Sequence, residues 1–278
     1  MDRDFVSIAA GTFTLEGRSR GGNETWFRLK ELGLGFDIGR CPDELVHMPH
    51  VFVTHAHLDH AVGIPLYAGQ RRLKRIAGGR VYVPAEVLSD FRDLMAIYQK
   101  LEETDYDIEL VGVKAGDIVS ISKTLEARVH QATHRVPANA FEVLSLRHHL
   151  RSEFANLSGE EIAVLRKSGA EVTEETRKSL FFYTGDTDRG ILEQNTAIFK
   201  SQVLVIECTF VEDGDQVRAE KYRHIHFDDI AEFAGSFDND LIVLTHFSLR
   251  YSREEIREAI RKRCPESIRS RIRIALGD

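Results

Sequence analysis

The chain has 278 residues, of which 42% are hydrophobic and 29% are charged, and its formal net charge at pH 7 is -7. This composition is typical of a globular protein, and no apolar run approaches the roughly 20 residues that cross a bilayer, which excludes a membrane-spanning protein. The negative net charge argues against a protein that coats itself with nucleic acid, because phosphate binding relies on clustered lysine and arginine.

The N-terminal stretch "MDRDFVSIAAGTFTLEGRSR" lacks the layout of a signal peptide. The three cysteines, Cys41, Cys208 and Cys264, are too few and too widely spaced for a disulfide framework or a thiolate zinc site. We therefore expect reduced thiols and a cytoplasmic protein.

Short apolar, β-branched runs predict strands at 32–39, 50–55, 79–84, 124–134, 141–146, 179–186, 201–210 and 240–247. Helical spacing predicts helices at 84–103, 158–169, 226–237 and 252–263, and Ser158 and Ser252 each precede glutamates that favour a helix start. Strands and helices mix throughout, so we expect an α/β fold. No linker divides the chain, and we predict one domain over 1–278 with an inserted, polar and helix-forming arm at about 147–178.

Polar side chains follow these predicted strands at the points where the strands end. They are the cluster from His55 to His60, followed along the chain by His134, Asp186, Glu207 and His246. In open α/β sheets reactive groups gather at strand ends, because the sheet holds their backbone rigid while the following loops expose the side chains.

Imidazoles and carboxylates without thiolates suit zinc, with manganese or iron as alternatives. One coordination sphere would consist of His55, His57, His134 and Asp186. Asp59, His60 and His246 would build a second sphere if Asp186 bridges both ions. Two ions roughly 3.5 to 4 Å apart form an arrangement used for hydrolysis.

The motif "THAHLDH" at 54–60 resembles the HxHxDH motif of the metallo-β-lactamase fold. The later stretches "FDIGRCP", "YTGDT", "IECTF", "RHIHFDDI" and "LTHFSLRY" are similar to the short, plant-like form of tRNase Z, an endonuclease that removes the 3′ trailer from precursor tRNA. The resemblance covers nearly the whole chain. It implies a four-layer αββα sandwich, two zinc ions and a homodimer in which an arm of one subunit holds the tRNA processed in the other.

Residue by residue, the resemblance implies these metal ligands: His55, His57, Asp59, His60, His134, Asp186 and His246. Asp59 would also act as the base for the attacking water. Glu207 would pair with His224, which would protonate the leaving oxygen, and His226 is the alternative for that role. Arg250 and Tyr251 would contact a phosphate.

Several alternatives stay open at this point. Asp37 is either a hydrogen-bond acceptor for a ligand histidine or a plain turn residue. The basic stretches "RRLKR" at 71–75 and "RKRCPESIRSRIR" at 261–273 are solvated helix faces or phosphate contacts. The alternative functions are a hydrolase of small phosphodiesters, a glyoxalase II-like hydrolase of thioesters or lactones, and a noncatalytic RNA-binding protein.

Overall fold

The computed structural model describes residues 4–277, which form two seven-stranded sheets. The strands of the first sheet, in spatial order, are β1 (Phe5–Ala10), β2 (Phe13–Arg20), β3 (Glu24–Leu29), β4 (Leu34–Phe36), β5 (His50–Phe52), β6 (Arg80–Pro84) and β7 (Glu109–Val113). The strands of the second, in spatial order, are β14 (Ile272–Ile274), β13 (Leu241–Thr245), β12 (Val203–Glu207), β11 (Thr173–Tyr183), β10 (Asn139–Leu150), β9 (Leu125–Gln131) and β8 (Ile118–Ser122).

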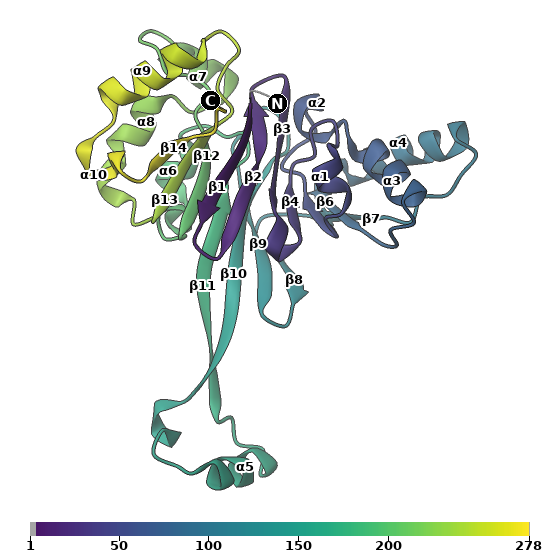
Figure 1. Ribbon diagram of the computed structural model, residues 1–278, viewed down its shortest axis with the longest axis vertical. Coiled ribbons are helices and arrows are strands. Elements are labelled where there is room, and N and C mark those ends of the chain that lie inside the picture. The colour runs from purple at the N-terminus through teal and green to yellow at the C-terminus, as the bar shows by residue number, and fades with distance from the viewer. Residues whose placement is uncertain (1–3, 278) are drawn as a thin grey trace.

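Helices cover the outer face of each sheet (Figure 1). Those that follow strands of the first sheet are α1 (Asp43–Val46), α2 (Leu58–Ala61), α3 (Ile64–Leu73) and α4 (Leu88–Leu101). The helices on the side of the second sheet are α6 (Gly190–Gln194), α7 (Gln216–Tyr222), α8 (Phe227–Glu232), α9 (Arg253–Arg263) and α10 (Glu266–Arg269), whereas α5 (Gly159–Lys167) covers neither sheet and lies between β10 and β11 in the chain. Short 3-10 turns lie at Lys30–Leu32, Ala85–Val87, Ser152–Phe154, Thr196–Phe199 and Ala234–Ser236.

Apolar side chains form three layers of core, one between the sheets and one under the helices on each side. Between the sheets, the ring of Phe36 lies 4.8 Å from that of Phe181, and the ring of Phe52 lies 5.0 Å from that of Phe141. Each pair joins a strand of the first sheet to a strand of the second. The predicted αββα sandwich is confirmed, and its inner layer fixes the two sheets against each other.

All eight predicted strands are present, but the N-terminal hairpins β1 to β3 and the strands β7, β8 and β14 were not predicted. The four predicted helices appear as α4, α5, α8 and α9, each within a few residues of its expected bounds. The basic stretch "RRLKR" falls at the end of α3, where Arg71 is buried and donates to the backbone carbonyls of Val46, Ala77 and Gly78.

The stretch 147–178 is less helical than expected. β10 and β11 continue into it as a two-stranded ladder that pairs Arg147 with Thr176 and Leu150 with Thr173. Beyond this ladder lie a 3-10 turn and α5, and the whole segment projects away from the sheets (Figure 1). In residues 4–277 no helix is long and apolar enough to cross a membrane.

Candidate metal centre

The loops that follow four strands of the second sheet, β9, β11, β12 and β13, which run in the same direction, and one strand of the first meet at one edge of the sandwich. After β5 the chain stays extended to His57, which is the N-cap of the one-turn helix α2, so that helix presents Asp59 and His60. His134, Asp186 and His246 follow β9, β11 and β13. The polar side chains that the sequence placed at strand ends therefore converge from both sheets.

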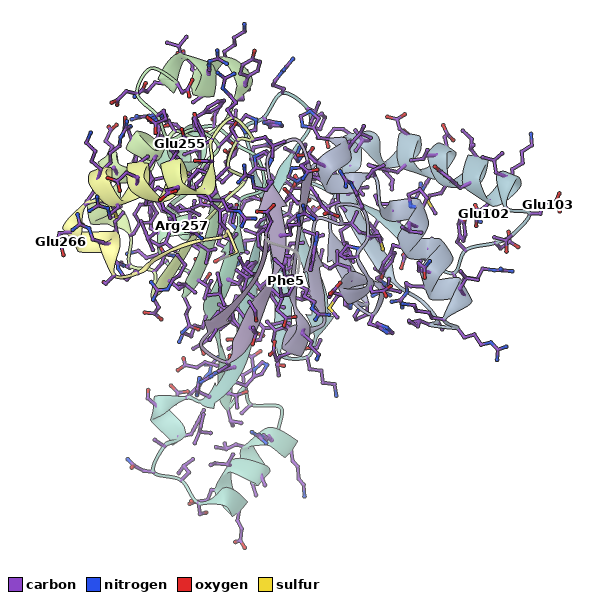
Figure 2. The ribbon with its side chains drawn as sticks, turned by 45° about the horizontal axis from the view of Figure 1, so that its top comes forward. Phe5, Glu102, Glu103, Glu255, Arg257 and Glu266 are labelled. Carbon is purple, nitrogen blue, oxygen red and sulfur yellow. The ribbon has the colours of Figure 1, made fainter. Side chains whose placement is uncertain are left out.

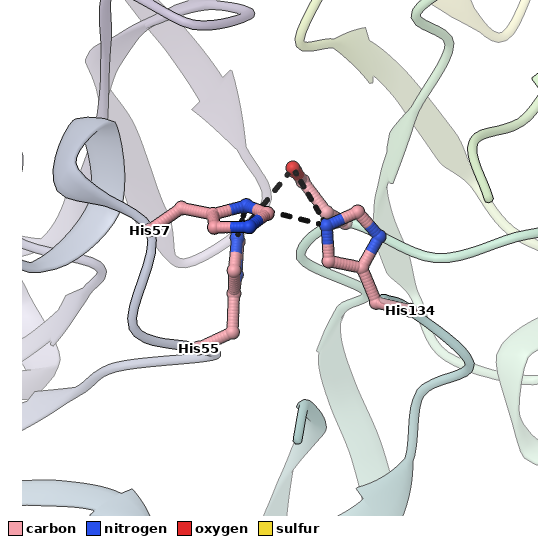
Figure 3. Close-up of side chains that lie close together, drawn as sticks. His55, His57 and His134 are labelled. Carbon is pink, nitrogen blue, oxygen red and sulfur yellow. Dashed lines mark hydrogen bonds and ion pairs between the residues drawn. The ribbon is translucent and has the colours of Figure 1, made fainter. Parts of the chain in front are cut away.

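His55, His57, His134 and Asp186 form the first donor group, whose potential ligand atoms all lie within 4.8 Å of one another (Figure 3). His55 Nε2 lies 2.9 Å from His57 Nδ1, which in turn lies 3.3 Å from His134 Nε2. Asp186 Oδ2 lies 3.7 Å from His55 Nε2 and 3.9 Å from His134 Nε2. These three imidazoles and one carboxylate are a donor set that suits a metal ion.

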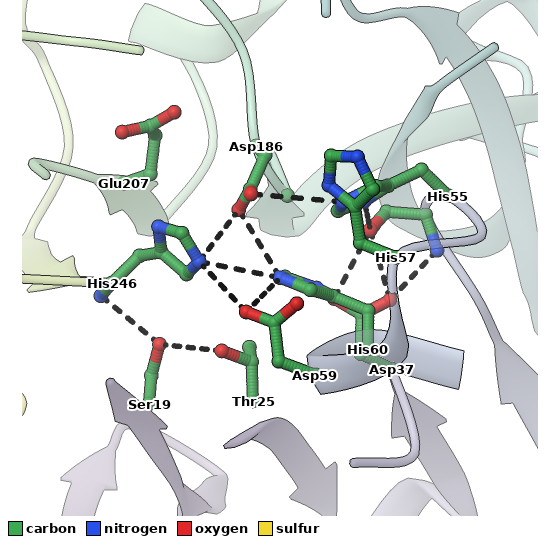
Figure 4. A network of polar contacts seen from close by, with 12 residues as sticks. Ser19, Thr25, Asp37, His55, His57, Asp59, His60, Asp186, Glu207 and His246 are labelled. Carbon is green, nitrogen blue, oxygen red and sulfur yellow. Dashed lines mark hydrogen bonds and ion pairs between the residues drawn. The ribbon is translucent and has the colours of Figure 1, made fainter. Parts of the chain in front are cut away.

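Asp59, His60 and His246 form the second donor group (Figure 4). The Nε2 atoms of the two histidines lie 3.3 Å apart, and Asp59 Oδ2 lies 3.5 Å from each. Asp186 Oδ1 faces this group, at 3.4 Å from His60 Nε2 and 3.3 Å from His246 Nε2. Asp186 thus turns one oxygen toward each group, as a bridging carboxylate does.

The outward nitrogen of each buried histidine is bonded to an oxygen atom. His55 Nδ1 contacts Thr54 Oγ1, His60 Nδ1 contacts Asp37 Oδ2, His134 Nδ1 contacts the carbonyl of Arg223 and His246 Nδ1 contacts Thr209 Oγ1, all at 2.8–3.0 Å. A carboxylate or carbonyl acceptor fixes a proton on Nδ1 and leaves the lone pair of Nε2 directed inward. Inward lone pairs only about 3 Å apart repel one another unless a cation or a proton lies between them.

Asp37 is the acceptor at the base of this arrangement, as the first of its two sequence interpretations expected. It is fully buried, and its carboxylate accepts hydrogen bonds from Thr54 N, Thr54 Oγ1 and the hydroxyl of Tyr183, besides its contact with His60. The backbone of Asp37 is left-handed, with φ at 51°, which aims the side chain back under the loop of the histidines. Asp37 therefore connects β4, β5 and β11 beneath the centre.

Charges within the centre are strongly coupled. Burial lowers the pKa of His55, His57 and His134, so their neutral, ligating forms are favoured. Burial alone would raise the pKa of Asp186, but the imidazole of His246 and its neighbours hold it well below its usual range. His55, His57 and His134 therefore present neutral imidazoles beside the ionised carboxylate of Asp186, the protonation states that metal binding requires. Burial alone would also lower the pKa of His60, but the charges of Asp186 and Asp37 raise it well above its usual value.

The Oδ1 atom of Asp186 also indicates a metal site. It is fully buried, and within residues 4–277 it has no hydrogen-bond partner apart from the two ion-pair contacts described above. An ionised oxygen in such surroundings needs a cation.

Glu207, the last residue of β12, lies beside the centre and holds His224. Its Oε1 accepts from Thr187 N and contacts His224 Nδ1 at 2.8 Å, while Oε2 accepts from Thr209 N, Thr209 Oγ1 and Ile225 N. Burial alone would lower the pKa of His224, but the charge of Glu207 and this hydrogen bond raise it to about 9. The chain's own charges therefore favour the imidazolium form of His224, whose ring lies 5.0 Å from that of His134 and 5.4 Å from that of His246.

His226, the alternative to His224, points elsewhere. Its ring caps α8 by accepting from Asp228 N, and its other nitrogen contacts the carbonyl of Glu212. Both ring nitrogens are thus engaged in the local fold.

The two residues predicted to contact a phosphate differ in exposure. Arg250 is exposed in the loop after β13. Tyr251 is buried, and its hydroxyl donates to Asp215. Substrate contact by either residue stays a prediction.

Three features of the site were not predicted from the sequence. Gly22, whose φ of 72° suits glycine, donates its backbone N–H to Asp59 Oδ2 at 2.8 Å. Thr209 bonds His246, and the left-handed Arg223 supplies the carbonyl for His134. Two of these contacts use backbone atoms, which carry no residue-specific signal in a sequence.

Comparisons with known proteins agree with this geometry. A family model described as a Beta-lactamase superfamily domain matches residues 37–247, which include all seven predicted ligands. The chain is 35% identical over 251 residues to tRNase Z TRZ1 of Arabidopsis thaliana, covering 89% of this chain and 90% of that protein. It is 32% identical to tRNase Z TRZ2 of the same plant, covering 90% and 72%. TRZ2 is named as chloroplastic, and a cytoplasmic location for this chain stays a prediction.

Two solved structures share the fold. The metallo-β-lactamase fold protein YhfI of Bacillus subtilis superposes with a TM-score of 0.63 at 14% identity, covering 93% of this chain and 94% of that chain. The short form of human tRNase Z, ELAC1, superposes with a TM-score of 0.57 at 17% identity, covering 98% and 94%. With the sequence relatives, these matches confirm the predicted resemblance: the chain belongs to the tRNase Z family of the metallo-β-lactamase superfamily.

Proposed function

We propose that this protein is a metal-dependent endoribonuclease that removes the 3′ trailer from precursor tRNA. One observation carries the proposal: two donor groups share Asp186, and beside them the imidazole of His224 is hydrogen-bonded to the carboxylate of Glu207. Membership of a family whose relatives are named tRNase Z supports the choice of RNA over other esters.

The two donor groups fit two metal ions, and we infer that the ions are zinc. His55, His57, His134 and Asp186 would hold one ion, and Asp59, His60, His246 and Asp186 the other. Three features support this assignment: the absence of thiolates, the inward Nε2 atoms and the two-sided Asp186 carboxylate. When bound, such ions supply a nucleophilic water at neutral pH and stabilise the charge on phosphate.

The chain's own residues then divide the proton transfers. Asp59, fixed by the N–H of Gly22, orients the attacking water and takes its proton. As the oxygen of water bonds to phosphorus, the bond from phosphorus to the ribose O3′ breaks and its electron pair leaves with O3′. His224 donates a proton to that oxygen, and Glu207 stabilises the imidazolium beforehand. The products are a tRNA with a 3′ hydroxyl and a trailer with a 5′ phosphate.

A single incubation tests the assignment against its alternatives. Purified protein is mixed with a 3′-extended precursor tRNA, with bis(p-nitrophenyl) phosphate and with a thioester, each with and without chelator, and the RNA cut is mapped. We expect one chelator-sensitive cut at the 3′ end of the mature tRNA. Asp59→Ala is expected to abolish it, whereas Lys123→Ala, an exposed residue in the β8–β9 turn, serves as the control.

The other outcomes identify the other functions. Cleavage of the thioester alone would assign the chain to the glyoxalase II-like hydrolases. Cleavage of bis(p-nitrophenyl) phosphate without any cut in RNA would leave a small-molecule phosphodiesterase. RNA binding without turnover of any of the three compounds would favour a noncatalytic role.

We further infer that two copies associate through an apolar stripe on α2, α3 and α4. The stripe consists of exposed apolar side chains: Leu58, Val62, Leu66, Leu73, Leu94, Ile97, Tyr98 and Leu101. Two adjoining cavities of about 310 and 670 Å³ share Val62, Pro65 and Tyr98, so they form a continuous groove along the stripe, and Ile97 and Leu101 lie outside their lining. Glu102 and Glu103 lie at its outer end (Figure 2).

An exposed apolar face this long marks an interaction site, and two helices side by side offer a self-complementary surface for a twofold contact. Light scattering after gel filtration tests the inference. The wild type is expected to elute as a dimer and the double variant Leu66→Glu, Ile97→Glu as a monomer with an unchanged circular dichroism spectrum. A dimer that survives this double substitution would place the interface elsewhere.

A further inference from the structure

Two loops that carry residues of the centre also carry exposed cations. Arg135 directly follows His134, and Lys221 and Arg223 lie just before His224. We call Arg135, Lys221, Tyr222 and Arg223 the basic rim. All four side chains are exposed.

The cations of the basic rim are unpaired. Within residues 4–277, none of Arg135, Lys221 and Arg223 takes part in an ion pair. Other arginines near this end of the sheet are neutralised, as Arg189 is by Glu232 and Arg263 by Asp213. In a chain with a net charge of -7, three unpaired cations beside the centre mark a local site for anionic groups.

Tyr222 lies within this cationic cluster. Its side chain is 37% exposed, the Cζ atom of Arg135 lies 6.0 Å from its ring centroid, and the Nζ atom of Lys221 lies 5.4 Å from it. Proteins that bind unpaired RNA combine these two elements, an exposed aromatic ring on which a base stacks and basic side chains that follow the phosphates.

A cavity also lies beside His224 and one residue of the basic rim. The cavity, of about 740 Å³, adjoins the centre, and Arg223 is the one residue of the basic rim among those that line it. Its other lining residues include Thr133 and His224 as well as four carboxylates, those of Asp188, Glu193, Glu220 and Asp229. This volume lies within the range of pockets that hold small organic ligands. The cavity thus connects Arg223 of the basic rim to the proton donor His224.

We propose that Tyr222 stacks on the base of the nucleotide immediately 5′ of the bond that is cut, and that Arg135, Lys221 and Arg223 contact the phosphates beside it. The proposal rests on the proposed function, because the side of the cut follows from His224. His224 protonates the departing O3′, so the ribose that carries this oxygen lies next to His224. Tyr222, the last residue of α7, lies two residues before His224 in the chain.

The spacing between Arg135 and Tyr222 fits this role. A planar base between a guanidinium and a ring needs a separation of about 7 Å, since each stacked contact takes about 3.5 Å. The observed 6.0 Å requires a shift of about 1 Å in an exposed arginine side chain. Arg135 can therefore form the second face of the base-binding site.

Substitutions at Tyr222 test the stacking. With precursor tRNA, Tyr222→Leu is expected to raise KM about 10-fold and to leave kcat nearly unchanged, whereas Tyr222→Phe, which keeps the ring, behaves like the wild type. A second substrate lacks the base immediately 5′ of the cut but keeps its ribose and phosphates. On this abasic RNA the wild type and Tyr222→Leu should have equal KM values.

A spectroscopic measurement that needs no turnover follows the same base. With 2-aminopurine at this position, binding should quench its fluorescence in the wild type and in Tyr222→Phe, and much less in Tyr222→Leu. For the cations, Arg135→Ala, Lys221→Ala and Arg223→Ala should each reduce the slope of log affinity against log salt by about 0.7. Lys123→Ala, an exposed lysine without an ion pair in the described chain, should leave the slope unchanged.

Different results would contradict the proposed function and the stacking role of Tyr222. If the wild type does not cut precursor tRNA, the proposed function is wrong. If it cuts normally but Tyr222→Leu has an unchanged KM, or loses equally on the intact and the abasic RNA, Tyr222 does not stack on this base.

Discussion

The hydroxyl of Thr209 lies between the proposed proton donor and a proposed metal ligand. It is 2.6 Å from Glu207 Oε2, 3.0 Å from His246 Nδ1 and 3.2 Å from His224 Nδ1. A hydroxyl has one proton, which the short contact assigns to Glu207, so its lone pair accepts from His246 Nδ1–H. Thr209 thereby keeps the Nε2 lone pair of His246 directed at the centre.

Replacing Thr209 tests this positioning role. Thr209→Val keeps the shape but removes the acceptor, and we expect it to weaken the binding of the second zinc ion about 10- to 100-fold. Thr209→Ser keeps the hydroxyl and should bind zinc as the wild type does. Competition with a chromophoric chelator measures both affinities. Equal affinities for the wild type and Thr209→Val would show that other contacts orient His246.

The roles proposed for His224 and Glu207 predict that the effect of losing His224 on the cleavage rate depends on the leaving group. His224→Ala should slow cleavage of precursor tRNA by a factor of about 10² to 10⁴, because the departing O3′ needs a proton. Hydrolysis of bis(p-nitrophenyl) phosphate should change little, since nitrophenolate leaves without one. Steady-state rates on both substrates provide the measurement, and losses of equal size would contradict the role of proton donor.

The side chains of this site were predictable from the sequence, whereas the contacts that hold them were not. Two features were sufficient to predict that the donors lie together: the motif from His55 to His60, and the positions of His134, Asp186 and His246 at strand ends. The carbonyl of Arg223 and the N–H of Gly22 could not be predicted, because every residue has these atoms and only the folded loop decides where they point. Tyr222 was missed for a related reason, since a single exposed tyrosine has no pattern in the sequence.

At the scale of the elements, apolar strands and capped helices were predictable, whereas the N-terminal hairpins were not. β2, "FTLEGRSR", carries charged residues at alternate positions: Glu16 and Arg18 form ion pairs, and the buried Arg20 donates to the backbone carbonyls of Ser248 and Tyr251. β8 is mostly exposed at the edge of its sheet. Such strands are stabilised by pairing with their neighbours rather than by their own hydrophobic content.

The ladder of β9 and β10 contains a buried carboxylate that makes its stability depend on pH. Glu142 is 3% exposed, its Oε2 lies 2.9 Å from His130 Nε2 and Arg128 lies nearby at 3.8 Å. Burial alone would raise the pKa of Glu142, but the hydrogen bond to His130 and the charge of Arg128 hold it below its usual value. The contribution of this carboxylate to stability is therefore complete above its unfolded pKa and is lost as the pH falls through the folded pKa.

Glu142→Gln should lower the free energy of unfolding by about 2 kcal/mol at pH 7. The difference from the wild type should shrink as the pH falls below about 4.5, where the native carboxylate also takes up a proton. Urea unfolding at several pH values between 3.5 and 7 measures it. Glu109→Gln, an exposed carboxylate on β7 paired with Arg80, is the control and should show a small difference at every pH. If the difference in the free energy of unfolding between Glu142→Gln and the wild type does not change with pH, the charge of Glu142 contributes nothing to stability.

For the whole molecule, the position of the centre between the sheets links metal binding to folding. His55 to His60 follow β5 of the first sheet, while His134, Asp186 and His246 follow strands of the second. A second connection, the backbone bridge between Gly21 and Ser248, crosses the same edge. Ions bound by both sets of ligands would therefore join the two halves of the sandwich. They would stabilise the folded state and not the unfolded state, because the ligands are far apart in the unfolded chain.

Removing the metal should accordingly lower the thermal stability of the whole sandwich. A ligand at a thousandfold excess over its Kd stabilises by about 4 kcal/mol, and in a domain of this size that corresponds to a shift in Tm of roughly 10 °C. Differential scanning calorimetry with and without chelator measures the shift, and elemental analysis measures the zinc content of each sample. Lys123→Ala should show the wild-type shift, whereas Asp186→Asn, which lacks the bridging charge, should contain less zinc and respond weakly to chelator. A chelator that removes the zinc from the wild type without changing its Tm would show that the sheets are held together by their apolar core alone.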